Sequence, residues 1–310
     1  MHFLSFTWNP SEGIDLGFFV IRYYSIMFIV AFTLGWYLMK KIFVKEGINL
    51  ELLDKLFIYA VISLLAGARI GHVLFYQSEL ITQDPLAVFL PIQTVPEFKF
   101  TGFQGLASHG ATILGLIAMY YFNKKYLKAK ILWLLDRFVI PVAAGTVFVR
   151  IGNFINSEII GKPTEESFPL AVQFVRSDIG KNEAMRITGT KDHNQAFDAI
   201  VNNPKFSDVL NEIPFSHPAQ LYKAFGYIFV FLILWFVYWK TDKSKQSGFL
   251  FGLFFVLLFT VRFFAEYYKK SQGGFESMLG DSLSTGQWLS IPFILIGLYF
   301  MIQSRKKVTP

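Results

Sequence analysis

The 310-residue sequence contains no cysteine, and only 16% of its residues are charged. The lack of cysteine excludes disulfides, thiolate nucleophiles in the protein itself and cysteine-ligated metals. The low charge argues against a soluble domain, since soluble domains carry roughly 25% charged residues. Residues 1–17 hold no basic region and no small-residue cleavage site, so we expect no cleavable signal peptide. Hydrophobic residues are abundant instead, at 53%, and aromatic residues make up 18%.

Seven apolar stretches reach about 18 residues, the length that a helix needs to cross a bilayer. They are Phe18–Met39, Leu52–Phe75, Gly105–Phe122, Ile131–Val149, Pro218–Trp239, Gly248–Tyr268 and Gly286–Gln303. No internal repeat is visible among them, which weakens transporter folds built from inverted repeats. We expect an all-α polytopic membrane protein in which residues 1–310 form a single integral membrane domain with about seven transmembrane helices.

The basic residues lie mostly in short clusters beside these stretches, although a net charge of +7 would in another setting suggest nucleic acid. Clusters follow the first span, join the third to the fourth and the fifth to the sixth, and follow the seventh. The positive-inside rule then predicts a multi-pass protein with its N-terminus outside and its C-terminus in the cytoplasm. The pattern indicates membrane topology and no nucleic-acid partner.

One long polar connection, Ser157–Ser216, joins the fourth span to the fifth on the predicted outer face. It is too polar to be embedded, and long loops are commonly either functional or disordered. We expect residues 157–216 to form a small extracytoplasmic head, in which Phe168–Val175 is a candidate strand.

A polar stretch, Arg150-Ile-Gly-Asn-Phe-Ile-Asn-Ser-Glu158-Ile-Ile-Gly161, follows directly on the fourth span. Polar and ionisable groups at this depth are costly, so they usually face a protein interior or a wet cavity and mark a functional site. The glycines allow close backbone approach or a positive φ, which suits a helix that gives way to a binding turn. The plainer interpretation of Arg150 is an interfacial arginine that extends to the lipid headgroups.

Several other polar residues are predicted at the same depth. At a rise of ~1.5 Å per residue across a core of ~30 Å, Tyr24, Arg69, His109, Arg150 and Arg262 all fall in the outer half of the membrane. We therefore predict that they line one cavity open towards the outer leaflet.

Each of these features also has a structural interpretation. The segment Gly67–Gly71 is a small-xxx-small motif of the kind that packs helices together. Arg262 and Glu266 are four residues apart and so able to neutralise each other on one helix face. His109 is equally compatible with a satisfied core histidine. The segment His217–Tyr222 either caps the fifth span or lines the cavity entrance.

Several arginines with few carboxylates suit a phosphate ester, because guanidinium groups pair bidentately with phosphate oxygens. The outer leaflet supplies such a ligand in an anionic phospholipid headgroup. The sequence contains neither a Gly-x-Ser-x-Gly elbow nor a His-Glu-x-x-His metal site. We therefore expect direct transfer to a second substrate, with His109 as general base and the arginines stabilising the departing phosphate.

The motif Arg150-x-Gly152-Asn153-x-x-Asn156-x-Glu158-x-x-Gly161 resembles the signature of the bacterial prolipoprotein diacylglyceryl transferases. The resemblance covers nearly the whole chain and includes Tyr23-Tyr24, Gly67–Tyr76, Ser108-His109-Gly110, His217–Tyr222 and Arg262-x-x-x-Glu266. Three positions depart from the family pattern, namely Ser108, Lys223 and Leu258.

The resemblance implies transfer of the diacylglyceryl group of phosphatidylglycerol to the lipobox cysteine of a prolipoprotein in the bacterial inner membrane, forming a thioether and releasing glycerol phosphate. The implied catalytic residues are His109, Arg150 and Arg262. The implied substrate-binding residues are Tyr24, Arg69, Asn153, Asn156, Glu158, Gln220, Tyr222 and Glu266. Neither a metal nor a cofactor is implied.

Two other functions fit the same polar cluster. A lipid or organic-anion transporter would use a cationic cavity without chemical change, although it usually shows repeats and paired broken helices. A membrane scaffold would use the polar groups only to associate helices.

Overall fold

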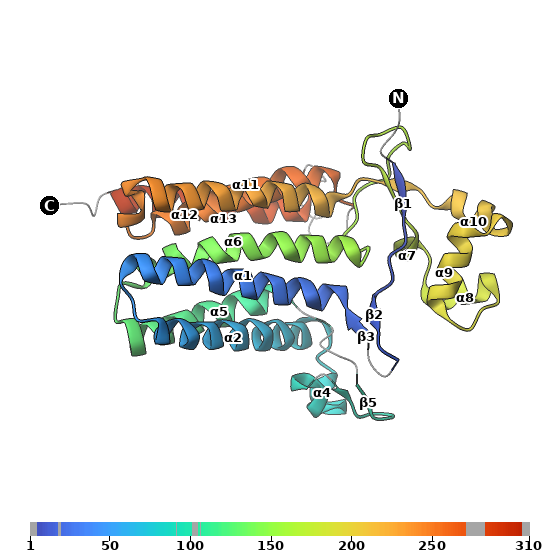
Figure 1. The fold of residues 1–310 in the computed structure, drawn as a ribbon, viewed down its shortest axis with the longest axis horizontal. Coiled ribbons are helices and arrows are strands. Elements are labelled where there is room, and N and C mark those ends of the chain that lie inside the picture. Colours follow the sequence, from blue (N-terminus) through green and yellow to red (C-terminus); the bar gives the residue numbers. More distant parts are fainter. Residues whose placement is uncertain are drawn as a thin grey trace. The chain divides into compact units, whose positions relative to one another are not determined.

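The structure is a computed structural model that describes residues 5–17, 20–90, 92–100, 105, 107–270 and 283–305. The chain divides into two compact units. Unit 1 comprises Met1–Gly35 and Val139–Pro310, and unit 2 comprises Trp36–Phe138. Figure 1 shows that long helices and a small group of short helices and strands make up the described chain.

Six helices of the described chain are long and apolar enough to cross a membrane. They are α1 (Tyr23–Glu46), α2 (Leu50–Tyr76), α6 (Ile131–Ile155), α11 (Ala219–Lys240), α12 (Phe249–Ala265, extended to Tyr268 by a 3-10 turn) and α13 (Thr285–Arg305). The prediction of an all-α, multi-pass membrane protein is confirmed.

The predicted span Gly105–Phe122 forms a shorter helix than expected. Helix α5 (Ser108–Phe122) has 15 residues and continues into a π-helical turn, Asn123–Leu127. The count of seven spans therefore stays a prediction. At the first span, Phe18 and Phe19 lie outside the described residues, and α1 begins only at Tyr23 because Val20–Arg22 form strand β3.

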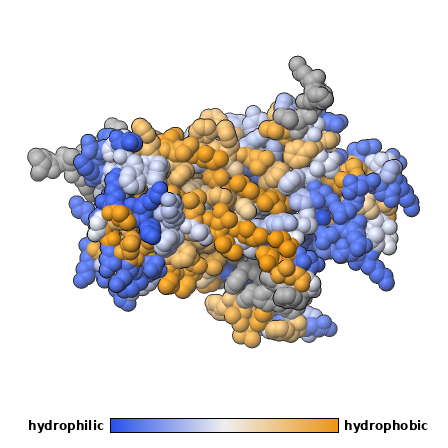
Figure 2. Space-filling model, viewed as in Figure 1, coloured by the Kyte–Doolittle hydropathy of each residue, from blue (hydrophilic) through white to orange (hydrophobic). Residues whose placement is uncertain are grey.

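Within unit 1, small residues bring the helices close together. Gly252 of α12 and Gly297 of α13 each face the other's carbonyl oxygen, and beside them the rings of Phe259 and Phe293 stack at 4.3 Å. Outward-facing side chains of α11 are apolar, and Phe225 is 64% exposed. Figure 2 shows hydrophobic surface over these helices and hydrophilic surface over the short helices α8–α10. This is the pattern expected of a protein whose helices contact lipid.

The part of α1 that belongs to unit 1 packs on the part of α6 in the same unit. A Cβ atom added at Gly145 would lie 3.6 Å from the Cβ of Ala31, and one added at Gly35 would lie 3.6 Å from the Cβ of Pro141. Such small residues let helix backbones approach closely in lipid, where no hydrophobic force drives association.

A small polar head also belongs to unit 1. Its sheet has the order β1–β6–β7, in which β1 (Phe6–Trp8) runs parallel to β6 (Val172–Phe174) and β6 runs antiparallel to β7 (Phe215–Ser216). Four helices accompany it, namely α7 (Val175–Asp178), α8 (Lys181–Thr188), α9 (His193–Asn202) and α10 (Ser207–Glu212). The strand expected within Phe168–Val175 is confirmed as β6. Because β1 joins this sheet, the head also includes residues from outside the predicted segment 157–216.

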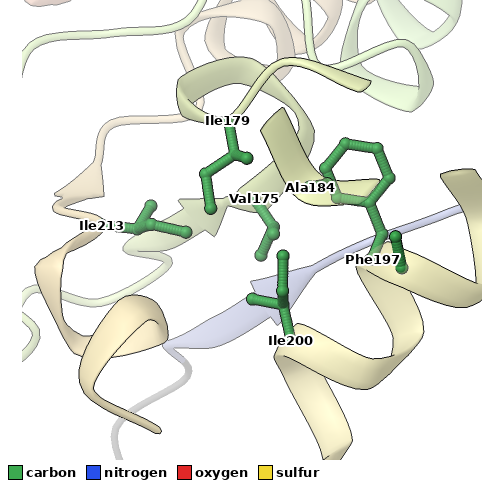
Figure 3. Close-up of a cluster of buried hydrophobic side chains, with 7 residues drawn as sticks. Val175, Ile179, Ala184, Phe197, Ile200 and Ile213 are labelled. Carbon is green, nitrogen blue, oxygen red and sulfur yellow. The ribbon is translucent and has the colours of Figure 1, made fainter. Parts of the chain in front are cut away.

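The head has its own hydrophobic core, drawn in Figure 3. Val175, Phe197 and Ile200 are fully or almost fully buried, with Ile179 and Ile213 packed against them. Val175 follows β6 directly and Phe197 lies on α9, so this core fixes the helices of the head to its sheet. A hairpin of β2 (Gly13–Asp15) and β3 leads from the head to α1.

In unit 2, α2 and α5 pack through glycines. Gly67 and Gly71 face the backbone of Gly110, and the amide of Ala107 donates to the carbonyl of Ala68 at 2.9 Å. The helix-packing interpretation of the Gly67–Gly71 motif is therefore confirmed. The unit also contains α3 (Leu80–Gln83), α4 (Pro85–Phe89), β4 (Ile92–Gln93) and β5 (Lys99–Phe100).

We expect Gly110→Val to destabilise the protein strongly. The added side chain would overlap the backbone of α2, and overpacking of this kind costs about 1–3 kcal/mol or more. Thermal unfolding in detergent, followed by size-exclusion chromatography, measures the loss. The control is Ile113→Val on the same helix, since Ile113 is 58% exposed; an equal loss in both variants would contradict the assigned contact.

Candidate functional site

An arginine and an asparagine in the last turns of α6 form one series of hydrogen bonds with a carboxylate that follows the helix. Nη1 of Arg150 donates to Oδ1 of Asn153 at 3.1 Å, and Nδ2 of Asn153 donates to Oε2 of Glu158 at 3.3 Å. Nδ2 of Asn156 donates to the other carboxylate oxygen of Glu158, also at 3.3 Å. The spacing of the polar motif follows from this geometry, because residues three apart share one face of a helix.

Helix α6 continues to Ile155, beyond the end of the predicted span at Val149, so Arg150 is a helical residue. The chain then turns sharply, with positive φ at Ser157 (53°) and Ile159 (59°). The backbone amide of Glu158 donates to the carbonyl of Asn153 at 2.9 Å, which holds the carboxylate beside the helix end.

The two glycines of the motif serve close approach, and the positive φ values fall on other residues. A side chain at Gly152 would overlap the ring of Tyr24, which lies directly against α6. A side chain at Gly161 would overlap His217 and Tyr268. Of the two roles proposed from the sequence for these glycines, close approach is the one they perform.

Hydrogen bonds clamp the end of the motif between two other segments. The amide of Gly161 donates to the carbonyl of His217 at 2.9 Å, and the amide of Lys162 donates to the carbonyl of Tyr268 at 2.7 Å. The side chain of Gln220 donates from Nε2 to the carbonyl of Glu158 at 2.6 Å. The start of α11 and the end of α12 are thereby tied to the motif.

An aromatic cluster surrounds this clamp. Nδ1 of His217 lies 3.1 Å from the hydroxyl of Tyr222, and the His217 ring contacts Phe168 edge-on at 4.6 Å and Tyr268 at 5.1 Å. Burial lowers the pKa of His217, which favours its neutral form. Tyr222, whose role was left open as cap or cavity lining, makes a contact within the clamp.

The end of α12 carries a second group of charges. Oε1 of Glu266 lies 2.7 Å from Nζ of Lys223, and Oε2 lies 3.7 Å from Nζ of Lys269. Their spacing suggested that Arg262 and Glu266 pair with each other. In the described chain, Glu266 instead forms ion pairs with the two lysines. The sequence interpretation missed Lys269, although it follows Glu266 by three residues and so has a simple helical spacing. It treated Lys223 only as a departure from the family pattern, because that residue lies on another helix and no local spacing relates it to Glu266.

Tyr227 connects the two groups. It is 4% exposed, and its hydroxyl interacts with Arg150, Arg262 and Glu266. Arg150 of α6 and Arg262 of α12 are thus brought to one tyrosine of α11. Sequence reasoning missed Tyr227, because one tyrosine within an aromatic-rich span gives no distinguishing signal.

Tyr24 lies on the other side of α6, in the first turn of α1. Its hydroxyl interacts with Glu158, Arg150 and Asn153. Its role in binding substrate stays a prediction. All of the predicted site residues except Arg69 and His109 lie in unit 1.

The two remaining residues lie in unit 2. Arg69 donates from Nη2 to the carbonyl of Ala87 at 2.5 Å and from Nε to that of Val88 at 3.3 Å, so it holds α4 in place. His109 is exposed in the first turn of α5, next to the glycine contact with α2. Its convergence with Arg150 stays a prediction.

Three buried polar atoms around the motif have no hydrogen-bond partner among the described residues. They are Nε of Arg150, Oγ of Ser157 and Oε1 of Gln220. Buried polar atoms are usually hydrogen-bonded, so this donor and acceptor set is suited to a polar ligand or to water. Within the described chain, no three histidine, aspartate or glutamate residues come together as a metal site would require.

The fold and the site define a multi-pass helical membrane protein with an arginine-containing polar site at one helix end. The profile of the prolipoprotein diacylglyceryl transferase family matches residues 12–303, and the chain belongs to this family. A phosphatidylglycerol–prolipoprotein diacylglyceryl transferase of Tolumonas auensis is 36% identical over 97% of this chain and 98% of its own. Enzymes of the same name from Bacteroides fragilis and Chloroherpeton thalassium are 34% and 32% identical, covering 98% and 97% of this chain and 97% and 94% of their own.

We expect Asn153→Leu to weaken the site and the local fold. The variant removes the amide that joins Arg150 to Glu158 and leaves buried donors unpaired, which costs about 1–3 kcal/mol. Thermal unfolding and limited proteolysis at the turn after Ile155 measure this loss. Asn156→Leu is the matched control, since the hydrogen bond from its side-chain amide to Glu158 is exposed. The control should lose less thermal stability than Asn153→Leu. A larger loss in the control would contradict the conclusion that the Asn153 hydrogen bonds matter more than that of Asn156.

Proposed function

We propose that this protein transfers the diacylglyceryl group of phosphatidylglycerol to the thiol of a prolipoprotein lipobox cysteine. The observation that carries the proposal is the family match over residues 12–303. The hydrogen-bonded series from Arg150 to Glu158 supports it, because it orders an arginine beside polar atoms that have no partner within the described chain.

In the proposed reaction, the cysteine sulfur attacks the glycerol carbon that carries the phosphate. A carbon–sulfur bond forms, the carbon–oxygen bond to the phosphate breaks, and glycerol phosphate leaves with the bonding electrons. The thiol proton passes to a base, for which His109 is our candidate. The substrate supplies the only thiol, since the protein contains no cysteine.

Arg150 and Arg262 are proposed to bind the phosphate and to stabilise the charge that it gains on departure. Guanidinium groups match phosphate oxygens bidentately, and such groups act most strongly where water is excluded. Tyr227 connects the two arginines and is itself only 4% exposed. Tyr24, Asn153, Asn156 and Glu158 are proposed to order Arg150 and the headgroup, while Gln220 and Tyr222 shape the turn.

The proposed location is the bacterial inner membrane, with the N-terminus and the head on the outer side and the C-terminus in the cytoplasm. The positions of the basic clusters support this orientation. A head on the outer side would lie where a prolipoprotein emerges from the membrane. Arg69, which donates to two carbonyls of α4 within unit 2, is proposed to bind substrate, and neither a metal nor a cofactor is proposed to take part.

Purified protein mixed with phosphatidylglycerol and a lipobox peptide should yield a diacylglyceryl thioether, detected by mass spectrometry of the peptide. A peptide with serine in place of the cysteine is the control and should remain unmodified. The absence of product under conditions that support one of the named relatives would defeat the proposal. Release or movement of unmodified lipid would favour transport instead.

We expect Arg150→Lys to lose most activity, at least about tenfold, while the protein remains folded. The lysine ammonium is a point charge and cannot reproduce the planar fork of a guanidinium. Initial rates of thioether formation, compared with thermal stability, measure the effect. Near-normal turnover would remove the bidentate phosphate argument.

A further inference from the structure

A buried ion network lies between α11 and α12. The side chains of Lys223 and Glu266 are 6% and 5% exposed, and their charged atoms lie 2.7 Å apart. Lys269 is 17% exposed and approaches the second carboxylate oxygen at 3.7 Å. Lysine and glutamate are almost never this deeply buried unless they are paired, so the contact is a specific feature of the site.

Glu266 follows Arg262 by one helical turn, and its carboxylate interacts electrostatically with that guanidinium. This spacing ordinarily lets an arginine and a glutamate pair directly, and the attraction is strong away from water. In the described chain, however, Arg262 makes no ion pair with a carboxylate and lies 6.0 Å from the ring of Phe259.

A carboxylate on Arg262 would compete directly with substrate. The planar fork of a guanidinium binds one carboxylate or one phosphate bidentately, so an arginine paired with Glu266 would have little capacity left for a lipid phosphate. Lys223 removes this competition because it occupies Oε1 of Glu266.

We propose that Lys223 is a positioning residue that holds the carboxylate of Glu266 and thereby leaves Arg262 available for the phosphate of the lipid headgroup. The inference rests on the proposed function. It adds a role that neither the polar motif nor the arginines reveal, since Lys223 acts only through Glu266.

Lys223→Met tests the proposal, because methionine keeps much of the length of the side chain and removes its charge. Glu266 then loses its closest cation, and Arg262 becomes its alternative partner. We expect the KM for phosphatidylglycerol to rise about tenfold, which corresponds to a modest loss of binding, while kcat changes less. If this variant does not fold, Lys223→Gln replaces it, since glutamine still donates a hydrogen bond but leaves the carboxylate charge in place.

The double variant Lys223→Met/Glu266→Gln separates this role from others. No carboxylate then remains to compete for Arg262, so the KM should fall back towards that of the wild type. If Glu266 instead touches the substrate itself, the double variant will bind no better than Lys223→Met. That outcome, or an unchanged KM in Lys223→Met, overturns the proposal.

Glu46→Gln is the matched control for a purely structural ion pair. Glu46 pairs with the buried Arg137 at 2.8 Å within unit 2. Its loss should reduce thermal stability without changing the KM. A KM that rises equally in Glu46→Gln and Lys223→Met would show a general effect of destabilisation and would also overturn the proposal.

Lipid retention distinguishes failure of this inference from failure of the proposed function. If the wild type forms no thioether, the proposed reaction is wrong, and native mass spectrometry still measures the phosphatidylglycerol that each variant retains. Lys223→Met should retain less than the wild type, and the double variant should retain more than Lys223→Met. Equal retention in all three proteins overturns the role of Lys223.

Discussion

The hydrogen bonds from Arg150 through Asn153 to Glu158 fix the polar end of α6, and the rest of unit 1 is arranged around them. Polar groups in hydrocarbon have no water to bind and must find partners inside the protein. A helix end that carries Arg150 and Asn153, followed at once by Asn156, therefore needs a carboxylate close by. The turn through Ser157 and Ile159 supplies it by returning Glu158 to the helix end.

This return also explains why three distant segments meet. Once the chain has turned back, the backbone around Gly161 pairs with the carbonyls of His217 and Tyr268, at the start of α11 and the end of α12. Arg150, Arg262 and Tyr227 consequently lie on different helices, and Tyr227 interacts with both arginines. The lysines that pair with Glu266 keep its charge balanced, so the site retains an excess of cations suited to an anionic headgroup.

Much of the fold was predictable because the hydrocarbon core imposes simple rules of length and composition. Each long apolar stretch contains a helix in the described chain, and six of these helices are long enough to cross a membrane. The ends of the helices were less predictable. Helix α6 continues through Arg150 to Ile155, because the polar residues find partners within the protein and the helix need not end where hydropathy falls. Helix α5 begins only at Ser108 and is shorter than its apolar stretch.

The sequence by itself determined the membrane class, the helical segments and the polar motif, since hydropathy and local spacing are written directly in the order of residues. Only the tertiary structure decided the partners: Glu158 with Asn153, Glu266 with Lys223, and Tyr227 with the two arginines. Lys223 and Glu266 are far apart in the sequence, and α11 and α12 must pack before their charges meet. Contacts of this kind depend on how helices approach in three dimensions, which no local pattern encodes.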